Sequence, residues 1–239
     1  MRVLIVDTET SSADAATTEL VEVAGVIYDC TLGATVDCFS TIVAASGNPA
    51  EHINGVPAGL VLDASAGSRE AAMAVVCAMA KSCRYIVAHN AVFDRTVLVA
   101  ELGSAKWVCT YTDVEWPKAP ASGRLVDIAL AHGVGVVRAH RAIEDCLTLA
   151  AAFGAVRALG VDLDEWITEA ATATWSLVIA YVGHHNNHIA KAAQFRWDPA
   201  ERHWVRRVRS QKAEEVRGQM AAHQIKVSVH AERPRDAGA

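Results

Sequence analysis

The hydrophobic and polar positions in the first part of the chain follow the pattern of β-strands. Residues 2–10 begin with a continuous apolar run, which is typical of a buried strand. Residues 20–28 alternate like a strand, residues 35–43 give a third strand, and the turn residues 31–33 lie between them. The pattern therefore predicts an antiparallel meander that opens with the apolar strand.

Between residues 48 and 175 the pattern predicts helices separated by short strands. Residues 48–59 contain Pro and Gly and are expected to form a loop. Residues 85–88 form a short buried strand, which leads into a helix with Asn90 as its N-cap. The other expected elements are a strand at 107–110 and helices at 68–81, at 125–131, from about 145 to 159 and at 162–175.

From residue 176 onward the order of the predicted elements changes. The pattern gives a strand, a helix, two strands around the turn at 198–201, a helix and a final strand. This β-α-β-β-α-β order is that of a split βαβ, ferredoxin-like module. We therefore expect two domains, an α/β domain over residues 1–175 and a small α+β module over residues 176–239.

The composition is that of a globular, intracellular protein. Of the 239 residues, 52% are hydrophobic and 21% are charged. No apolar run approaches the ~20 residues that a membrane-spanning helix needs, and no signal segment precedes the first strand. The six cysteines are scattered without a C-x-x-C pair, which favours reduced thiols. We expect a cytoplasmic protein with no membrane partner.

The net charge of −5 conceals a difference between the two ends of the chain. Residues 1–160 contain 11 Lys and Arg against 17 Asp and Glu, a net charge of −6. Residues 191–235 contain 11 Lys and Arg against 5 Asp and Glu, a net charge of +6. An acidic body with a basic tail indicates an anionic partner that approaches from the C-terminal side.

Two acids follow the apolar run of the first strand. Side chains two residues apart on a strand point to the same face, so Asp7 and Glu9 project together from its end. In apolar surroundings the two carboxylates would repel each other and lose hydration, and a bound cation removes both penalties. The alternative is a solvated strand end with two surface acids.

Two later stretches could complete such a site. Asp94 lies about one turn into the helix that follows the strand at 85–88, although an acid there also suits the helix dipole. His140 and Asp145 are five residues apart and would diverge by about 140° on one regular helix. They can share a site only if His140 lies in the loop before the helix; otherwise His140 is a surface residue.

These three stretches, in this order and in these structural settings, resemble those of the DEDDh exonucleases. These are proofreading-subunit-like nucleases with a ribonuclease H-like fold, and the likeness spans residues 1–155. It implies a mixed sheet flanked by helices and a metal-dependent 3′→5′ exonuclease. It also implies residue roles: Asp7, Glu9, Asp94 and Asp145 as metal ligands, His140 as general base, and Thr8, Thr10, His89 and Asn90 as contacts to the terminal nucleotide.

The chemistry of these residue types fits that activity. Four carboxylates supply the oxygen ligands that Mg²⁺ prefers, so we expect two Mg²⁺ ions, with Mn²⁺ able to substitute. His140 could accept the proton of the attacking water near neutral pH. One departure is the stretch Ser11–Asp14, where relatives often have glycine, which leaves the shape of the first loop open.

We expect DNA rather than RNA as the substrate, with release of 5′-mononucleotides. The alternatives are a 3′→5′ exoribonuclease of the same fold, which would differ in how it treats the 2′-hydroxyl, and a non-catalytic nucleic-acid adaptor. The filled catalytic positions argue against the adaptor. A polymerase-bound proofreading subunit and self-association both stay open.

The basic tail interleaves aromatic and cationic residues, a composition suited to backbone contact and base stacking. The alternative is a small domain with core tryptophans and solvated arginines. The residues expected to contact nucleic acid are Trp197, Trp204, Arg206, Arg207 and Arg209. His184, His185 and His188 could form a metal site, but a histidine-rich helix start is the better explanation of this group.

Overall fold

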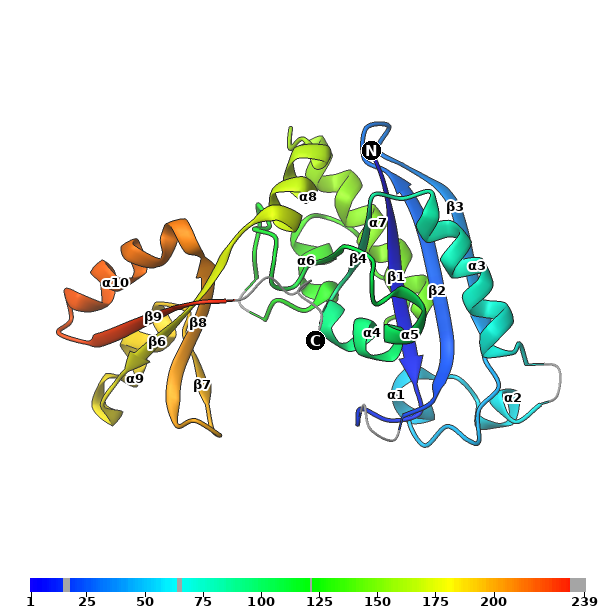
Figure 1. The fold of residues 1–239 in the computed structure, drawn as a ribbon, viewed down its shortest axis with the longest axis horizontal. Coiled ribbons are helices and arrows are strands. Elements are labelled where there is room, and N and C mark those ends of the chain that lie inside the picture. The colour runs from blue at the N-terminus through cyan, green and yellow to red at the C-terminus, as the bar shows by residue number, and fades with distance from the viewer. Residues whose placement is uncertain (15–17, 64–65, 121, 233–239) are drawn as a thin grey trace. The chain divides into compact units, whose positions relative to one another are not determined.

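The structure, a computed structural model, describes residues 1–14, 18–63, 66–120 and 122–232 (Figure 1). The chain divides into two compact units, Met1–Ala171 and Thr172–Ala239. The sequence pattern placed this boundary between residues 175 and 176. Each unit has its own sheet and its own hydrophobic core.

The first unit is built on a five-stranded mixed sheet with the strand order β3-β2-β1-β4-β5. Its central strand β1 (Arg2–Thr10) pairs antiparallel with β2 (Leu20–Asp29) and parallel with β4 (Tyr85–Ala88). The outer strands are β3 (Ala34–Ile42) and β5 (Trp107–Cys109). The predicted meander and the predicted mixed α/β sheet are both confirmed.

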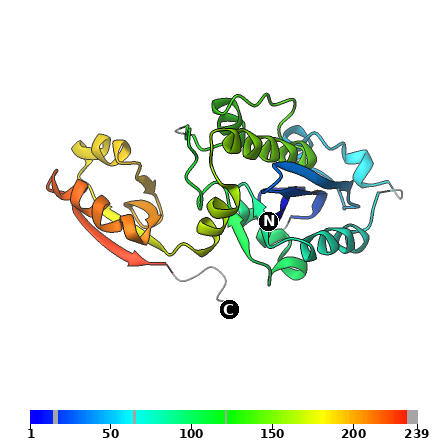
Figure 2. The ribbon, with the colours of Figure 1, turned by 90° about the horizontal axis from the view of Figure 1, so that it is seen from above.

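Helices cover both faces of this sheet (Figure 2). Side chains of β1 alternate between the faces, so that Leu4 and Val6 pack with α3 (Arg69–Lys81) and Val3 and Ile5 pack with α7 (Ala142–Ala158). Asp7 and Glu9 continue the odd-numbered series of β1. Their carboxylates therefore lie on the side of the sheet that α7 covers.

The shorter helices connect these elements. The region expected to be a loop at 48–59 contains α1 (Glu51–Asn54) and the start of α2 (Ala58–Val61), so the loop prediction was wrong there. Helices of four residues are too short to show a helical period in the sequence. The others in this unit are α4 (Ala91–Val97), α5 (Val99–Leu102), α6 (Leu125–Ala131) and α8 (Leu163–Thr172).

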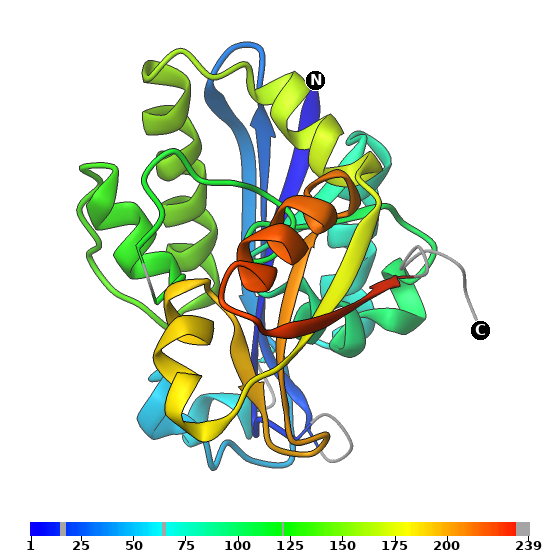
Figure 3. The same cartoon turned by 90° about the vertical axis from the view of Figure 1, so that its left-hand side faces the viewer.

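The second unit has the predicted β-α-β-β-α-β order (Figure 3). Its antiparallel sheet has the strand order β7-β8-β6-β9, which is that of a split βαβ module. The helices α9 and α10 pack on one face of this sheet, against Val178 and Trp204 among others. The elements are β6 (Trp175–Tyr181), α9 (Asn187–Ala192), β7 (Arg196–Asp198), β8 (His203–Arg209), α10 (Ala213–Ala221) and β9 (Lys226–Ala231), with single 3₁₀ turns at His184–Asn186 and Ser210–Lys212.

Within the described part of the chain, no single helix has the length and apolar character needed to cross a membrane. Taken together, the bent pair α7 and α8 meets the criteria of length and composition alone.

Candidate active site

Four acids from three elements meet at the carboxyl end of β1. Oxygen atoms of Asp7, Glu9 and Asp145 lie within 4.8 Å of one another. Because β1 and β4 are parallel, their carboxyl ends share one edge of the sheet, and α4 begins there with Asp94 in its first turn. Asp94 is 3% exposed and accepts a hydrogen bond from the hydroxyl of Thr8, with 2.8 Å between Thr8 Oγ1 and Asp94 Oδ1.

Burial and mutual repulsion raise the pKa values of these acids. The pKa of Asp7 is raised well above its usual range, first by burial and then by the neighbouring carboxylates. Burial and the charge of Asp145 raise the pKa of Glu9 to about 8, and burial raises the pKa of Asp94 to about 7. Burial also raises the pKa of Asp145. A group of buried oxygen ligands that destabilise one another is the donor set that a hard divalent cation fits.

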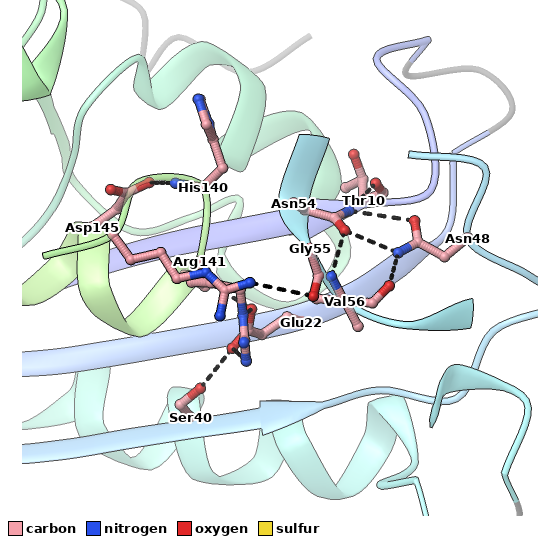
Figure 4. Close-up of polar contacts among 12 residues, drawn as sticks. Thr10, Glu22, Ser40, Asn48, Asn54, Gly55, Val56, His140, Arg141 and Asp145 are labelled. Atoms are coloured by element: carbon pink, nitrogen blue, oxygen red, sulfur yellow. Dashed lines mark hydrogen bonds and ion pairs between the residues drawn. The ribbon is translucent and has the colours of Figure 1, made fainter. Parts of the chain in front are cut away.

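His140 lies in the loop before α7, as a shared site requires. Its backbone N–H donates to Asp145 Oδ2 over 3.1 Å. Its φ angle is 62°, a left-handed conformation that a non-glycine residue adopts only when the surroundings impose it. The ring is exposed and points away from the Asp145 carboxylate (Figure 4).

Arg141, the residue after His140, forms an ion pair with Glu22. Glu22 is 1% exposed and lies directly opposite Glu9 in the register of β1 and β2. Arg141 donates to both oxygens of its carboxylate, from Nε over 2.8 Å and from Nη2 over 3.0 Å (Figure 4). The hydroxyl of Ser40 on β3 also donates to Glu22, over 3.2 Å. The His140 loop is thereby attached to β2 through a bidentate contact.

The loop is also held on the other side of His140. Arg138 Nη2 lies 3.5 Å from the carbonyl oxygen of Gly55, which follows α1. The preceding residue, Asn54, donates through Nδ2 to the carbonyl of Thr10 over 3.2 Å (Figure 4). The end of β1, helix α1 and the His140 loop therefore form one connected polar network.

A cavity of about 700 Å³ opens over the acids. The sequence-predicted residues that line it are Asp7, Thr8, Glu9, His89, Asn90, Asp94, His140 and Asp145. Its other lining residues include Phe93, Tyr111, Ser122, Arg124 and the start of α6. The structure thus brings all five expected catalytic residues to one cavity that is large enough for a nucleotide.

Two of the expected nucleotide contacts have other partners. His89 Nδ1 lies 2.9 Å from the hydroxyl oxygen of Thr110, and His89 Nε2 lies 3.0 Å from the carbonyl oxygen of Gly123. Burial lowers the pKa of His89 to about 4, so the ring is neutral. Thr10 is 7% exposed, its hydroxyl donates to the carbonyl of Ser12, and it is not among the described residues that line the cavity.

Asn90 differs from its expected role as a side-chain N-cap. It stands at the N-cap of α4 but has a φ angle of 74°, and its side chain makes no capping hydrogen bond. In this left-handed conformation the side chain does not accept from the first turn. Asn90 is instead exposed on the wall of the cavity.

The tail tryptophans separate into a core residue and a surface residue. Trp204 is 5% exposed in the core of the second unit, a position that suits the alternative of a core tryptophan, and its contact with nucleic acid stays a prediction. Trp197 is 49% exposed and lies beside Trp204 in the register of β7 and β8.

The tail arginines have partners within their own unit. Arg206 Nη1 donates to the carbonyl of Ala193 over 3.0 Å. Arg207 pairs with Glu232 over 2.6 Å, and its guanidinium carbon lies 3.9 Å from the centre of the Trp175 ring. Arg209 is half-buried. Arg233 and Arg235, which contribute to the basic charge of the tail, lie outside the described residues.

His184, His185 and His188 are exposed. In the described ranges only the Asp7, Glu9 and Asp145 cluster brings three metal-binding groups within ligand distance.

The sequence analysis did not predict a role in the site for Glu22, for Arg141 or for the segment 122–127. Glu22 carried a usable signal, because it is the one acid among the otherwise apolar residues 20–28 of β2, and a buried acid must be paired. Its partner is 119 residues away, and no local pattern points to it.

Comparisons by sequence find no relative. No family model matches the chain, and no curated protein does either. Comparison with solved structures does find matches. Exonuclease X in complex with 5′-overhanging duplex DNA is 23% identical and has a TM-score of 0.55, over 70% of this chain and 99% of that one.

Two further matches extend the comparison. Exonuclease I of E. coli in complex with a dT13 oligonucleotide is 16% identical with a TM-score of 0.57, over 74% of this chain and 48% of that one. The nuclease domain of 3′hExo, a DEDDh family member bound to rAMP, is 17% identical with a TM-score of 0.53, over 66% of this chain and 92% of that one. This chain therefore spans nearly all of exonuclease X but about half of exonuclease I.

The sequence itself contains local motifs like those of exodeoxyribonuclease X. They are His89-Asn90-Ala91 before Phe93-Asp94-Arg95, Trp107-x-Cys109-Thr110, Trp116-Pro117, and His140-Arg141-Ala142 before Asp145-Cys146. The solved exonuclease X structure agrees with this likeness at the level of the fold. Residues Met1–Ala171 have the ribonuclease H-like fold of the DEDDh 3′→5′ exonucleases.

Proposed function

We propose that the chain is a metal-dependent 3′→5′ exonuclease that releases 5′-mononucleotides from DNA. The observation that carries this proposal is the cluster of Asp7, Glu9 and Asp145, whose oxygens lie within 4.8 Å of one another in the cavity that Asp94 and His140 also line. Such a cluster is unstable without a cation, and the fold is one in which nucleases are found.

Asp7, Glu9, Asp94 and Asp145 would hold two Mg²⁺ ions, or Mn²⁺ in their place. When bound, these ions supply Lewis-acid stabilisation of the scissile phosphate and lower the pKa of a water molecule. The hydroxyl of Thr8 fixes the orientation of Asp94, and the backbone N–H of His140 fixes that of Asp145. The exposed imidazole of His140 accepts the proton of the attacking water.

The choice of DNA over RNA rests on the motifs shared with exodeoxyribonuclease X and on DNA in the matched exonuclease X structure. A DEDDh neighbour bound to rAMP supports the exoribonuclease alternative. Both alternatives use the same acids, and they differ only in their treatment of the 2′-hydroxyl.

One gel assay tests the activity. End-labelled single-stranded DNA, duplex DNA and RNA of one sequence are incubated with the full chain, with Mg²⁺ or with a chelator. We expect shortening of DNA from the 3′ end with Mg²⁺, slower shortening of RNA, and none with the chelator. Faster turnover of RNA would favour the exoribonuclease, and no cleavage of any substrate would favour the adaptor.

Three variants assign the roles. Asp7→Ala should reduce cleavage by several orders of magnitude, because a ligand of a shared cluster is lost. His140→Ala should lose about 10²–10⁴-fold in rate and keep its affinity for metal, measured by titration calorimetry. Asp37→Asn removes an exposed acid on β3 and serves as the matched control with unchanged activity. Collapse of metal affinity in His140→Ala would make His140 a ligand instead of the base.

A further inference from the structure

One wall of the cavity is the segment 122–127, which comprises a short turn with Arg124 and the start of α6. The described residues that line the cavity include five acids, Asp7, Glu9, Asp94, Asp127 and Asp145, and Arg124 is the one Lys or Arg among them. A nucleic-acid strand that enters this cavity brings more than one phosphate. The scissile phosphate would go to the acid cluster, and the next phosphate would meet negative charge unless a cation received it.

Among the described residues, the guanidinium group of Arg124 is hydrogen-bonded on one side only, through Nε. Its Nε donates to Asp127 Oδ2 over 3.0 Å, and its backbone N–H donates to Ser122 Oγ over 3.2 Å. The hydroxyl of Ser122 also donates to Asp127 Oδ2. The side chain of Arg124 is 77% exposed, and no described residue accepts a hydrogen bond from its two Nη nitrogens.

A guanidinium group that is fixed at Nε and open at both Nη nitrogens suits bidentate binding of a phosphate. Because Asp127 already limits the rotamers of Arg124, a ligand has less side-chain entropy to remove. The ion pair itself contributes little to stability, since it is exposed and joins residues three apart.

His89 and Tyr111 both contact Gly123, the residue before Arg124. Gly123 has a φ angle of +66°, and a Cβ atom at this position would lie 2.7 Å from Tyr111 Cε2. The neutral His89 ring donates from Nε2 to the Gly123 carbonyl and packs edge-on against Tyr111, with 5.6 Å between ring centroids. His89, Tyr111 and Gly123 are thus interlocked, and Gly123 directly precedes Arg124.

We propose that Arg124 is a phosphate-binding residue, which receives the phosphodiester on the 5′ side of the scissile one, and that His89 positions it through Gly123. This inference rests on the proposed nuclease function, because it needs a strand bound at the acid cluster. In this proposal His89 supports Arg124 through Gly123 and does not itself contact the nucleotide.

The test uses three substrates that differ in the phosphate in question. The first is a single-stranded DNA oligonucleotide. The second is the same oligonucleotide with an uncharged methylphosphonate at the linkage next to the scissile one, read in a single turnover. The third is a nitrophenyl ester of a nucleoside 5′-phosphate, which has one phosphodiester and no neighbour.

For Arg124→Ala we expect kcat/KM on the first substrate to fall by about ten- to a hundred-fold, the usual effect of losing a hydrogen-bonded charge pair. The wild-type chain should lose a similar factor on the methylphosphonate substrate, and Arg124→Ala should lose nothing further there. Both should hydrolyse the nitrophenyl ester at the same rate. The kcat/KM of Arg124→Lys on the first substrate should lie between the values for the wild-type chain and for Arg124→Ala, because lysine keeps the charge but not the planar fork.

The control is Arg2→Ala, which removes an exposed arginine that also pairs with an aspartate, Asp29, at the opposite end of β1. Its rates should match those of the wild-type chain on all three substrates. His89→Ala should reproduce part of the Arg124→Ala loss on the oligonucleotide and none on the ester. Equal losses on the oligonucleotide and the ester would overturn the proposal. So would an undiminished effect of Arg124→Ala on the methylphosphonate substrate.

A binding experiment separates this inference from the proposed activity. Fluorescence anisotropy with Ca²⁺ measures the affinity of both oligonucleotides without cleavage. If the wild-type chain cleaves nothing with Mg²⁺ or Mn²⁺, the exonuclease proposal fails. The phosphate site is then judged by affinity alone: it is supported if Arg124→Ala and the methylphosphonate weaken binding without adding to each other, and overturned if their effects are additive or absent.

Discussion

The four acids of the site are buried close together, which makes their charged forms unfavourable in the folded protein without a cation. Glu9 and Asp94 have pKa values of about 8 and about 7, raised mainly by burial, so the folded chain binds protons that the unfolded chain releases. The stability from this difference is present at low pH and is lost as the pH rises through these values. A bound cation replaces the protons and removes the penalty.

We therefore expect the free energy of unfolding of the metal-free protein to fall as the pH rises from about 5 to about 8. Denaturant melts in a chelator measure this slope, and added Mg²⁺ should stabilise the protein most at the upper end. Asp94→Asn should flatten part of the slope and raise stability at pH 8 in chelator, while its cleavage rate falls by orders of magnitude. A slope of the opposite sign would contradict the burial of these acids.

At this scale the sequence predicted the acids and His140 because their chemistry is local. A D-x-E at the end of an apolar strand and a histidine just before a helix are visible within ten residues. The residues that support the acids and His140 give no such local signal in the sequence. His89 bonds to Gly123, 34 residues away, and the burial that keeps its ring neutral comes from the assembled fold.

Among the elements, the loop between α6 and α7 depends on the sheet for its shape. Arg138 reaches Gly55 and Arg141 reaches Glu22, so His140 is held between two attachments. A displacement of about 1 Å at a reacting group can cost about 10²-fold in rate. The Glu22–Arg141 pair is thus expected to matter for the geometry of His140 as well as for stability.

Single and double variants separate these two roles. Arg141→Ala should lower the free energy of unfolding by about 3–5 kcal/mol, because it leaves the charge of Glu22 buried and unpaired. The pair Glu22→Leu with Arg141→Met should recover most of that stability but keep kcat at least about ten-fold below wild type, since the attachment is gone. Denaturant melts and steady-state rates check both. Full recovery of kcat in the double variant would restrict Arg141 to a structural role.

The predicted elements agree with the structure where the hydrophobic period is long enough to read. Strands β1, β2 and β4 and helices α3 and α6 lie where the pattern placed them. The pattern did not predict the short helices α1 and α2, of which α1 carries Asn54 and leads into Gly55, the residue that contacts the His140 loop. Short connecting elements are set by tertiary contacts, which a single sequence does not display.

At the scale of the whole molecule, the two units have separate cores. The core residues described for the first unit all precede residue 172, and those for the second begin at Val178. The stretch from Lys191 to Glu232 has 9 Lys and Arg against 5 Asp and Glu, so the second unit is basic where the first is acidic. This supports the expectation that the second unit helps to hold the nucleic acid.

Removal of residues 172–239 tests that expectation. The shortened chain should hydrolyse the nitrophenyl ester at an almost unchanged rate, because the acids and their supports all lie in the first unit. Long oligonucleotides should bind more weakly, with the largest loss at low salt, because each neutralised phosphate releases a counterion. Unchanged affinity and an unchanged salt slope would assign the second unit to another partner or to self-association.

Within the full chain, Trp197→Ala and Trp204→Ala form a matched pair. Trp204→Ala should destabilise the second unit by about 3–5 kcal/mol because it empties a core position. Trp197→Ala should leave stability unchanged and weaken binding only if its exposed ring contacts bases.

The separation of the acids along the chain has a consequence for biosynthesis. Asp7 and Glu9 leave the ribosome early, whereas His140 and Asp145 follow after more than half of the chain has been made. A nascent chain that ends before residue 140 has Asp7, Glu9 and Asp94 but lacks His140, Asp145 and the ion pair of Arg141 with Glu22. Under the proposed function, nuclease action would therefore begin only after the start of α7 has been made.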